Sequence, residues 1–129
     1  MVYRGGRKAN NMISFVNVLE WHKGFFPEAT FKSQLVHLAQ EIKELNNAVT
    51  DQERLEEGAD VVIVLISLRR FEETKEMAEN LLNYYYFNTG IDTTKRILKE
   101  IEKKIEIINK RKYFWNGEDY DRRRKIDNY

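Results

Sequence analysis

The chain has 129 residues, 42% of them apolar and 33% charged, which fits a single soluble domain with a modest core rather than a disordered chain. The absence of cysteine excludes disulfides, zinc–thiolate sites and cysteine nucleophiles, and it favours a reducing, cytoplasmic setting. The formal net charge of +1 gives no overall attraction for nucleic acid, so nucleic acid is not expected as a partner. The most apolar run, Ala59 to Leu68, is far shorter than the ~20 residues that span a bilayer, so a membrane is not expected either.

The pattern of apolar residues predicts four or five helices and no sheet, because strand-type alternation is hard to find and proline and glycine are scarce. The first helix is expected over about Asn11 to Lys23, and Gly24 ends it before the turn at Pro27. The second helix is expected from about Thr30 to Val49. Its apolar stripe consists of Leu35, Leu38, Ile42, Leu45 and Val49.

A third helix is expected to begin near Asp51, because Thr50 and Glu53 have the spacing of a capping box. The connection is so short that the second and third helices must lie antiparallel. From Ala59 to Leu68 the third helix is apolar on all sides, so it needs cover on every face. Either the rest of the monomer surrounds it or a second subunit covers it. In a chain of this length we favour the second subunit, and we expect a homodimer or a homotetramer.

A helical pattern continues from Arg69 to Phe87, and Asn88 to Gly90 is the next clear stop. The dense aromatic run Tyr84 to Phe87 indicates packing against a partner subunit, with a base-binding platform as the minor alternative. Both features favour an oligomer over a monomer.

A last helix, capped by Asp92 or Thr93, is expected to reach about Lys112. These elements make one domain over residues 1–115, followed by a charged, flexible tail over residues 116–129. The basic run from Arg122 to Lys125 is more typical of a solvated tail than of a nucleic-acid contact.

Four acids on the second and third expected helices differ from an ordinary solvated pattern. Glu41 and Glu44 are three residues apart and share a helix face, and the same holds for Glu57 and Asp60. Asp60 directly precedes an apolar run, where an unpaired carboxylate is costly. Twelve residues separate Glu44 from Glu57, enough to finish one helix, turn and return to the same level. We therefore expect the four carboxylates to converge on a metal site.

Ligation by oxygen alone selects hard ions, Mg²⁺ or Mn²⁺, and such ions commonly act on phosphates. Lys104 and Arg111 share a face of the last helix and could hold phosphate oxygens. The alternative is that these acids and basic residues lie on ordinary solvated helix surfaces. For most basic residues of the last helix that alternative is preferred, whereas two spaced acid pairs on adjacent helices favour the metal.

The pattern Glu41-x-x-Glu44, twelve residues, Glu57-x-x-Asp60 resembles the signature of the MazG-like, all-alpha nucleoside triphosphate pyrophosphohydrolases. The stretch Phe26 to Thr30, with His37 four residues before the first acid, resembles a subgroup found in bacteria and phages. That subgroup is associated with dATP and dGTP.

The end of the chain also resembles that subgroup, so that the likeness covers about Ile13 to Trp115. Its closing basic element is similar to Lys104, Asn109, Arg111 and Trp115. Two features depart from the subgroup. An extra segment, about Glu72 to Asn88, precedes the closing helix, and the internal spacing of the closing element differs by a residue or so.

The resemblance implies a MazG-like helical bundle, built as a homodimer or a dimer of dimers, that hydrolyses a nucleoside triphosphate to a monophosphate and pyrophosphate with Mg²⁺. It implies metal ions that bind the phosphate chain and activate a water for attack on the α-phosphorus. Glu41 or Glu44 would orient or deprotonate that water. Lys104, Asn109 and Arg111 would contact the substrate. The base and the sugar stay open.

Two further residues are candidates for contact with a substrate. His37 lies one turn before Glu41 on the acid face, where it could bond a phosphate or a metal-bound carboxylate; direct metal ligation is not expected. Trp21 lies off the apolar stripe of its helix and could stack on a base, while packing in the core or at an interface is an equal alternative.

Two other classes of function stand beside the enzyme. A di-iron bundle protein needs Glu-x-x-His pairs, and Glu41, Glu44 and Glu57 each lack a histidine three residues on. A non-enzymatic helical interaction protein would carry the acids on its surface and show no dependence on divalent ions.

Overall fold

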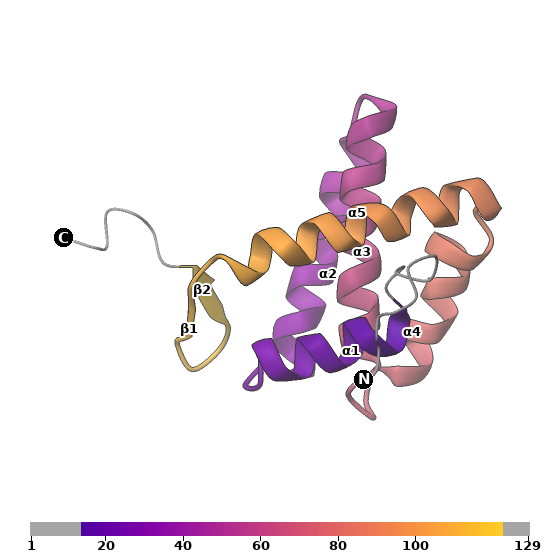
Figure 1. Ribbon diagram of the computed structural model, residues 1–129. Helices are drawn as coiled ribbons and strands as arrows, with labels where there is room; N and C mark the ends of the chain where they lie inside the picture. The colour runs from indigo at the N-terminus through magenta and orange to yellow at the C-terminus, as the bar shows by residue number, and fades with distance from the viewer. Residues whose placement is uncertain (1–13, 123–129) are drawn as a thin grey trace, which may run out of the picture.

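The structure is a computed structural model and describes residues 14–122. Most of these residues are helical, which confirms the expected fold class (Figure 1). The expected start of the first helix at Asn11 and most of the basic run of the tail lie outside the described residues. The elements are α1 (Phe15–Phe25), α2 (Phe31–Asn46), α3 (Asp51–Leu68), α4 (Lys75–Leu82), the π-helical turn η2 (Asn83–Phe87), α5 (Ile91–Asn109), β1 (Tyr113–Trp115) and β2 (Tyr120–Arg122).

The first three helices begin at side-chain caps. Ser14, Thr30 and Thr50 each accept a hydrogen bond from the backbone N–H three residues on, and in each case the side chain at that third position bonds back to the cap. These reciprocal bonds satisfy amides that have no partner within the helix. The capping box predicted at Thr50 and Glu53 is confirmed.

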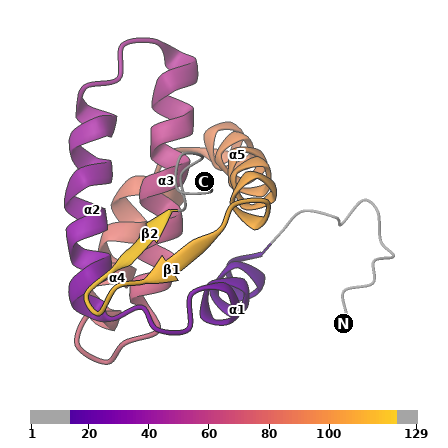
Figure 2. The same cartoon turned by 90° about the vertical axis from the view of Figure 1, so that its left-hand side faces the viewer.

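Helices α2 and α3 form the predicted antiparallel hairpin (Figure 2). Near the end of the hairpin remote from the turn, the buried Ser67 Oγ donates to Gln34 Oε1 at 2.9 Å, so these two residues lie level. Since both helices rise equally per residue, residues counted equally from this pair toward the turn also lie level. This hydrogen bond fixes the register of the hairpin at the end remote from the turn.

Helix α3 occupies the centre of the molecule, and α1, α2, α4 and α5 all pack against it. Most apolar side chains of its second half are fully buried within a single chain; they include Val61, Val62, Leu65, Ile66 and Leu68. The expectation that a second subunit covers this helix was therefore wrong, because α4 and α5 close over the faces that α1 and α2 leave open.

The helical pattern from Arg69 to Phe87 is interrupted by a turn after α3. The chain turns over Arg69–Thr74, where Thr74 Oγ1 donates to the carbonyl of Leu68 at 2.7 Å and so satisfies a free helix end. It then forms α4 and η2. Within the aromatic run, Tyr86 is buried in the core, whereas Tyr84 and Phe87 are exposed. Gly90, with φ of 99°, adopts a conformation that other residues rarely take, and α5 begins after it.

A short β-hairpin follows α5, contrary to the expectation of no sheet and of a tail from residue 116. Strands β1 and β2 pair antiparallel, with Tyr113 opposite Arg122 and Trp115 opposite Tyr120. The hairpin is attached to the turn between α1 and α2, because Tyr120 Oη accepts the backbone N–H of Glu28 at 2.8 Å. The rings of Tyr120 and Phe26 also pack together here. Each strand has only three residues, too few to show an alternating pattern in the sequence.

Among the helices of residues 14–122, none combines the length and the apolar character that a membrane crossing requires.

Candidate metal centre and adjoining cleft

The hairpin register brings the predicted acids together. Counted from the hydrogen-bonded pair Gln34 and Ser67, Glu41 and Asp60 are each seven residues nearer the turn, and Glu44 and Glu57 are each ten, so each pair lies at about the same level. One carboxylate oxygen from each of Glu41, Glu44 and Glu57 lies within 4.8 Å of the others. Three of the four predicted ligands therefore form a cluster in which each can offer an oxygen to one cation.

The burial of this cluster tests whether a cation fits it. Glu41 Oε1 and Glu57 Oε1 are both buried, and neither has a hydrogen-bond partner in the described part of the chain. A buried carboxylate oxygen without a partner is costly. A hard divalent cation would supply the missing partner to both oxygens at once, so the donor set fits Mg²⁺ or Mn²⁺.

The acids also raise one another's pKa values. Burial, followed by the neighbouring charges of Asp60, Glu44 and Glu57, raises the pKa of Glu41 to about 8. Burial and the charges of Asp60 and Glu44 likewise raise the pKa of Glu57. Without a cation, Glu41 thus holds its proton near neutral pH, and a bound cation would favour the ionised form of the whole cluster.

Asp60, the fourth predicted ligand, has a different partner. Lys104 Nζ donates to Asp60 Oδ2 at 3.1 Å, and both side chains are largely buried. Burial raises the pKa of Asp60 even though Lys104 opposes that shift. Burial acts to lower the pKa of Lys104, but the contact with Asp60 and the charges of Glu57 and Glu56 raise it overall. The ammonium group thus lies at the edge of the acid cluster.

A cleft of about 290 Å³ opens beside the cluster between α1, α2, α3, α5 and the β-hairpin. Glu41, Asp60, Lys104 and Arg111 line its charged part. Its other part is aromatic, where Phe26 lies 5.1 Å from Tyr113 and 5.0 Å from Tyr120, measured between ring centroids. The cleft therefore joins a candidate phosphate and metal region to a wall of flat side chains.

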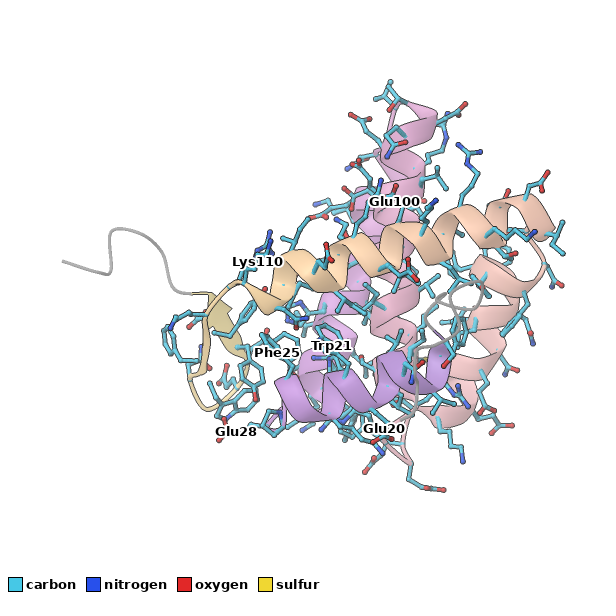
Figure 3. All side chains as sticks on the ribbon, in the orientation of Figure 1. Glu20, Trp21, Phe25, Glu28, Glu100 and Lys110 are labelled. Carbon is cyan, nitrogen blue, oxygen red and sulfur yellow. The ribbon has the colours of Figure 1, made fainter. Side chains whose placement is uncertain are left out.

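Trp21, from α1, lines the cleft in the space between α1 and α5 (Figure 3). Its Nε1 donates to Asn109 Oδ1 at 2.8 Å, and its ring stacks on Phe25 with centroids 5.7 Å apart. The structure thus places Asn109 against Trp21, where its side-chain oxygen is used in orienting the indole. Asn109 itself does not line the cleft.

His37 and Arg111 are also brought to the cleft. His37 Nε2 lies 3.0 Å from Asp119 Oδ1, so the loop of the β-hairpin reaches back to α2. Arg111 Nη1 lies 3.5 Å from the hydroxyl of Tyr113, at the entrance to β1. Both candidate substrate contacts are therefore held partly by the hairpin.

Several residues of the cleft were not predicted. Gln34 could have been found, because it shares a helix face with His37 and Glu41 at spacings of three and seven residues. His22 precedes the Phe-Pro turn without any pattern that marks it. Asp119 and Tyr120 belong to a hairpin with no sequence signal, so nothing in the pattern indicated their place.

Comparison of the chain with protein-family models, with curated proteins and with solved structures finds no match in any of the three. The function of the site is therefore inferred from its own chemistry.

Proposed function

We propose that the chain is a Mg²⁺-dependent nucleoside triphosphate pyrophosphohydrolase of the MazG-like type, with Mn²⁺ as a possible substitute. The observation that carries the proposal is the cluster of Glu41, Glu44 and Glu57, with its unpartnered buried oxygens, at the edge of an aromatic cleft. A divalent cation would neutralise the cluster and hold the phosphates of a triphosphate, whose base would then lie toward the aromatic rings. Lys104 and Arg111 would then face the phosphate chain.

In the proposed reaction, the oxygen of a water forms a bond to the α-phosphorus while the bond from that phosphorus to the α–β bridging oxygen breaks. Pyrophosphate leaves with the bridging oxygen, and the nucleoside monophosphate remains. Glu41 or Glu44 accepts the proton of the water, since a cation held by the cluster would keep these carboxylates ionised. A cation held by Glu41, Glu44 and Glu57 would supply charge neutralisation and lower the pKa of the attacking water.

Dependence on a divalent ion distinguishes this proposal from a non-enzymatic helical protein, and the type of ligand distinguishes it from a di-iron bundle. Within the described residues, no histidine belongs to the cluster of Glu41, Glu44 and Glu57, and the ligands are oxygen only. This donor set favours Mg²⁺ over iron.

The test is product analysis with purified protein, Mg²⁺ and a panel of nucleoside and deoxynucleoside triphosphates, including dATP and dGTP. We expect equal amounts of monophosphate and pyrophosphate. Diphosphate and inorganic phosphate as products would contradict cleavage at the α-phosphorus, and no consumption of any nucleotide with Mg²⁺ or Mn²⁺ would contradict the proposal as a whole.

We also propose that the protein assembles as a homodimer or homotetramer. The support is a set of large apolar side chains exposed where η2 meets α5: Tyr84 is 70% exposed, Phe87 55% and Ile91 72%. Side chains of this kind gathered in one region are typical of protein interfaces.

A further inference from the structure

Two polar side chains at the aromatic part of the cleft are almost completely buried. His22, from α1, is 4% exposed and Gln34, from α2, is 6% exposed, and both line the cleft. A buried polar group is normally retained because it has a partner. Each of these side chains has one polar end held by the protein, which leaves the other end for a ligand.

The partner of His22 fixes where its ring carries a hydrogen. Arg70 Nη1 lies 3.0 Å from His22 Nδ1 and also donates to the carbonyl of Phe26 at 3.0 Å. A guanidinium group can only donate, so Nδ1 must accept and the hydrogen must be on Nε2. Burial and the charge of Arg70 lower the pKa of His22 to about 3, which keeps the ring neutral in this tautomer. Within residues 14–122, Nε2 has no hydrogen-bond partner.

The partner of Gln34 fixes its amide in a similar way. Ser67, which is fully buried, donates its hydroxyl to Gln34 Oε1 at 2.9 Å and shares it with the carbonyl of Val64. This bond orients the amide, and the amide nitrogen of Gln34, with its two hydrogens, has no hydrogen-bond partner among the described residues. His22 and Gln34 thus contribute two hydrogen-bond donors to the lining of one cleft.

The position of these donors relative to the acids suits a nucleotide. Gln34 and Glu41 are seven residues apart on one face of α2, a rise of about 10 Å along the helix. A nucleotide whose phosphates lie at the acid cluster would therefore place its base near Gln34. The rings of Trp21, Phe26 and Tyr120 line that part of the cleft and offer faces for a planar base.

We infer that His22 and Gln34 read the base of the bound nucleotide and select guanine over adenine. Guanine presents two neighbouring acceptors, O6 and N7, whereas adenine presents N7 beside an amino group that is itself a donor. Two donors fixed by the protein match the guanine edge. Adenine would set its amino group against one of them and leave buried donors without acceptors, which weakens binding strongly. This inference rests on the proposed function only in taking a nucleotide as the ligand.

The experiment measures binding of dGMP and dAMP without added metal, by quenching of Trp21 fluorescence. It uses full-length protein carrying Trp115→Phe, since Trp115 does not line the cleft and would add background. We expect dGMP to bind at least about tenfold more tightly than dAMP, as a base-reading pair of donors implies. Equal affinity for the two nucleotides, or no quenching by either, would overturn the inference.

Two variants remove one donor each while keeping the fold. Gln34→Met keeps the length of the side chain, and Ser67 still donates to the carbonyl of Val64. His22→Asn keeps an acceptor for Arg70, and because the side chain is shorter its amide nitrogen does not reach the position from which His22 Nε2 donates to the cleft. We expect either variant to reduce the preference for dGMP to within about threefold, whereas Val36→Ala, at an exposed position of α2, keeps it. An unchanged preference in Gln34→Met would contradict the assignment.

The outcomes separate this inference from the proposed function. If dGMP is preferred and the preference depends on Gln34, but no triphosphate is hydrolysed, the base-reading site stands and the proposed reaction fails. If triphosphates are hydrolysed with Mg²⁺ while guanine and adenine are bound equally, the reaction stands and the role of His22 and Gln34 is wrong.

Discussion

Glu44 and Glu57 face one another across the antiparallel pair α2 and α3, with a carboxylate oxygen of each within 4.8 Å of the other. Two like charges at this distance repel, and the proximity of Glu44 is one of the causes that raise the pKa of Glu57. The hairpin register that creates this repulsion is fixed elsewhere, by the turn at Thr50 and by the buried bond between Ser67 and Gln34. The helix cap at Thr50 and the buried contacts between α2 and α3 thus keep the acids close together despite their repulsion.

The first prediction concerns Glu57→Gln, which keeps the shape of the side chain and removes one charge from the cluster. We expect hydrolysis of a triphosphate to fall at least about 100-fold, because a metal ligand is lost. In metal-free buffer we expect the variant to melt a few degrees above the parent, because repulsion in the cluster is reduced. Thermal melts with and without Mg²⁺, together with pyrophosphate release, measure both effects.

Glu73→Gln is the matched control for that change, since Glu73 is an exposed acid in the turn after α3, remote in sequence from the cluster. It should leave both activity and the Mg²⁺ response as in the parent. If Mg²⁺ raises the melting temperature of the parent no more than that of Glu57→Gln, the three acids do not form a metal site.

The second prediction concerns Lys104→Met, which removes the cation beside Asp60. We expect the melting temperature to fall by a few degrees, because a largely buried carboxylate loses its partner. We also expect KM for the triphosphate to rise more than kcat falls, since the ammonium group faces the phosphate region without taking part in bond breaking. Lys99→Met, an exposed position one turn and a half earlier on α5, should change neither quantity.

The sequence was sufficient to predict the parts of the fold that local chemistry determines. The cap at Thr50 and the short connection after it predicted the α2–α3 hairpin, and the spacing of Glu41, Glu44 and Glu57 then placed the three acids together. These features depend on helical periodicity and on residues close in sequence, so a pattern can indicate them.

The remaining features depend on contacts between residues far apart in the chain. The β-hairpin is held by Tyr120 against the turn before α2, and no local pattern indicates such a contact. The apolar third helix could be covered by another subunit or by α4 and α5, and only the positions of those helices show that the chain covers it itself. His22 is a similar case, because its role depends on Arg70, which is 48 residues away.

The third prediction concerns assembly. We expect Ile91→Glu to convert an oligomer to a monomer in analytical ultracentrifugation, because Ile91 belongs to the exposed apolar group at η2 and α5. The change should not unfold the chain, since an acid at the first position of α5 interacts favourably with the helix dipole. Val49→Glu, at a comparably exposed apolar residue in the connection between α2 and α3, is the control and should leave the assembly unchanged. A parent protein that sediments as a monomer would contradict the proposal directly.

The last prediction concerns the dependence of stability on pH. The folded protein keeps a proton on Glu41 up to a pKa of about 8, whereas the unfolded chain releases it near the ordinary value of 4.5. Between these values the folded state binds more protons than the unfolded state, so the free energy of unfolding must fall as the pH rises. Below about pH 6.5 the neutral His22, whose pKa is lowered to about 3, opposes this effect, because the ring takes up a proton on unfolding. In metal-free buffer we therefore expect the melting temperature to decline from about pH 6.5 to about pH 8, and Glu41→Gln to flatten that decline while Glu73→Gln preserves it. Millimolar Mg²⁺ should raise the melting temperature of the parent most at the upper end of this range, where the ionised cluster binds the cation without first losing a proton. A melting temperature that rises with pH over the same range in metal-free buffer would show that Glu41 ionises freely, and that the cluster does not hold its acids under mutual repulsion.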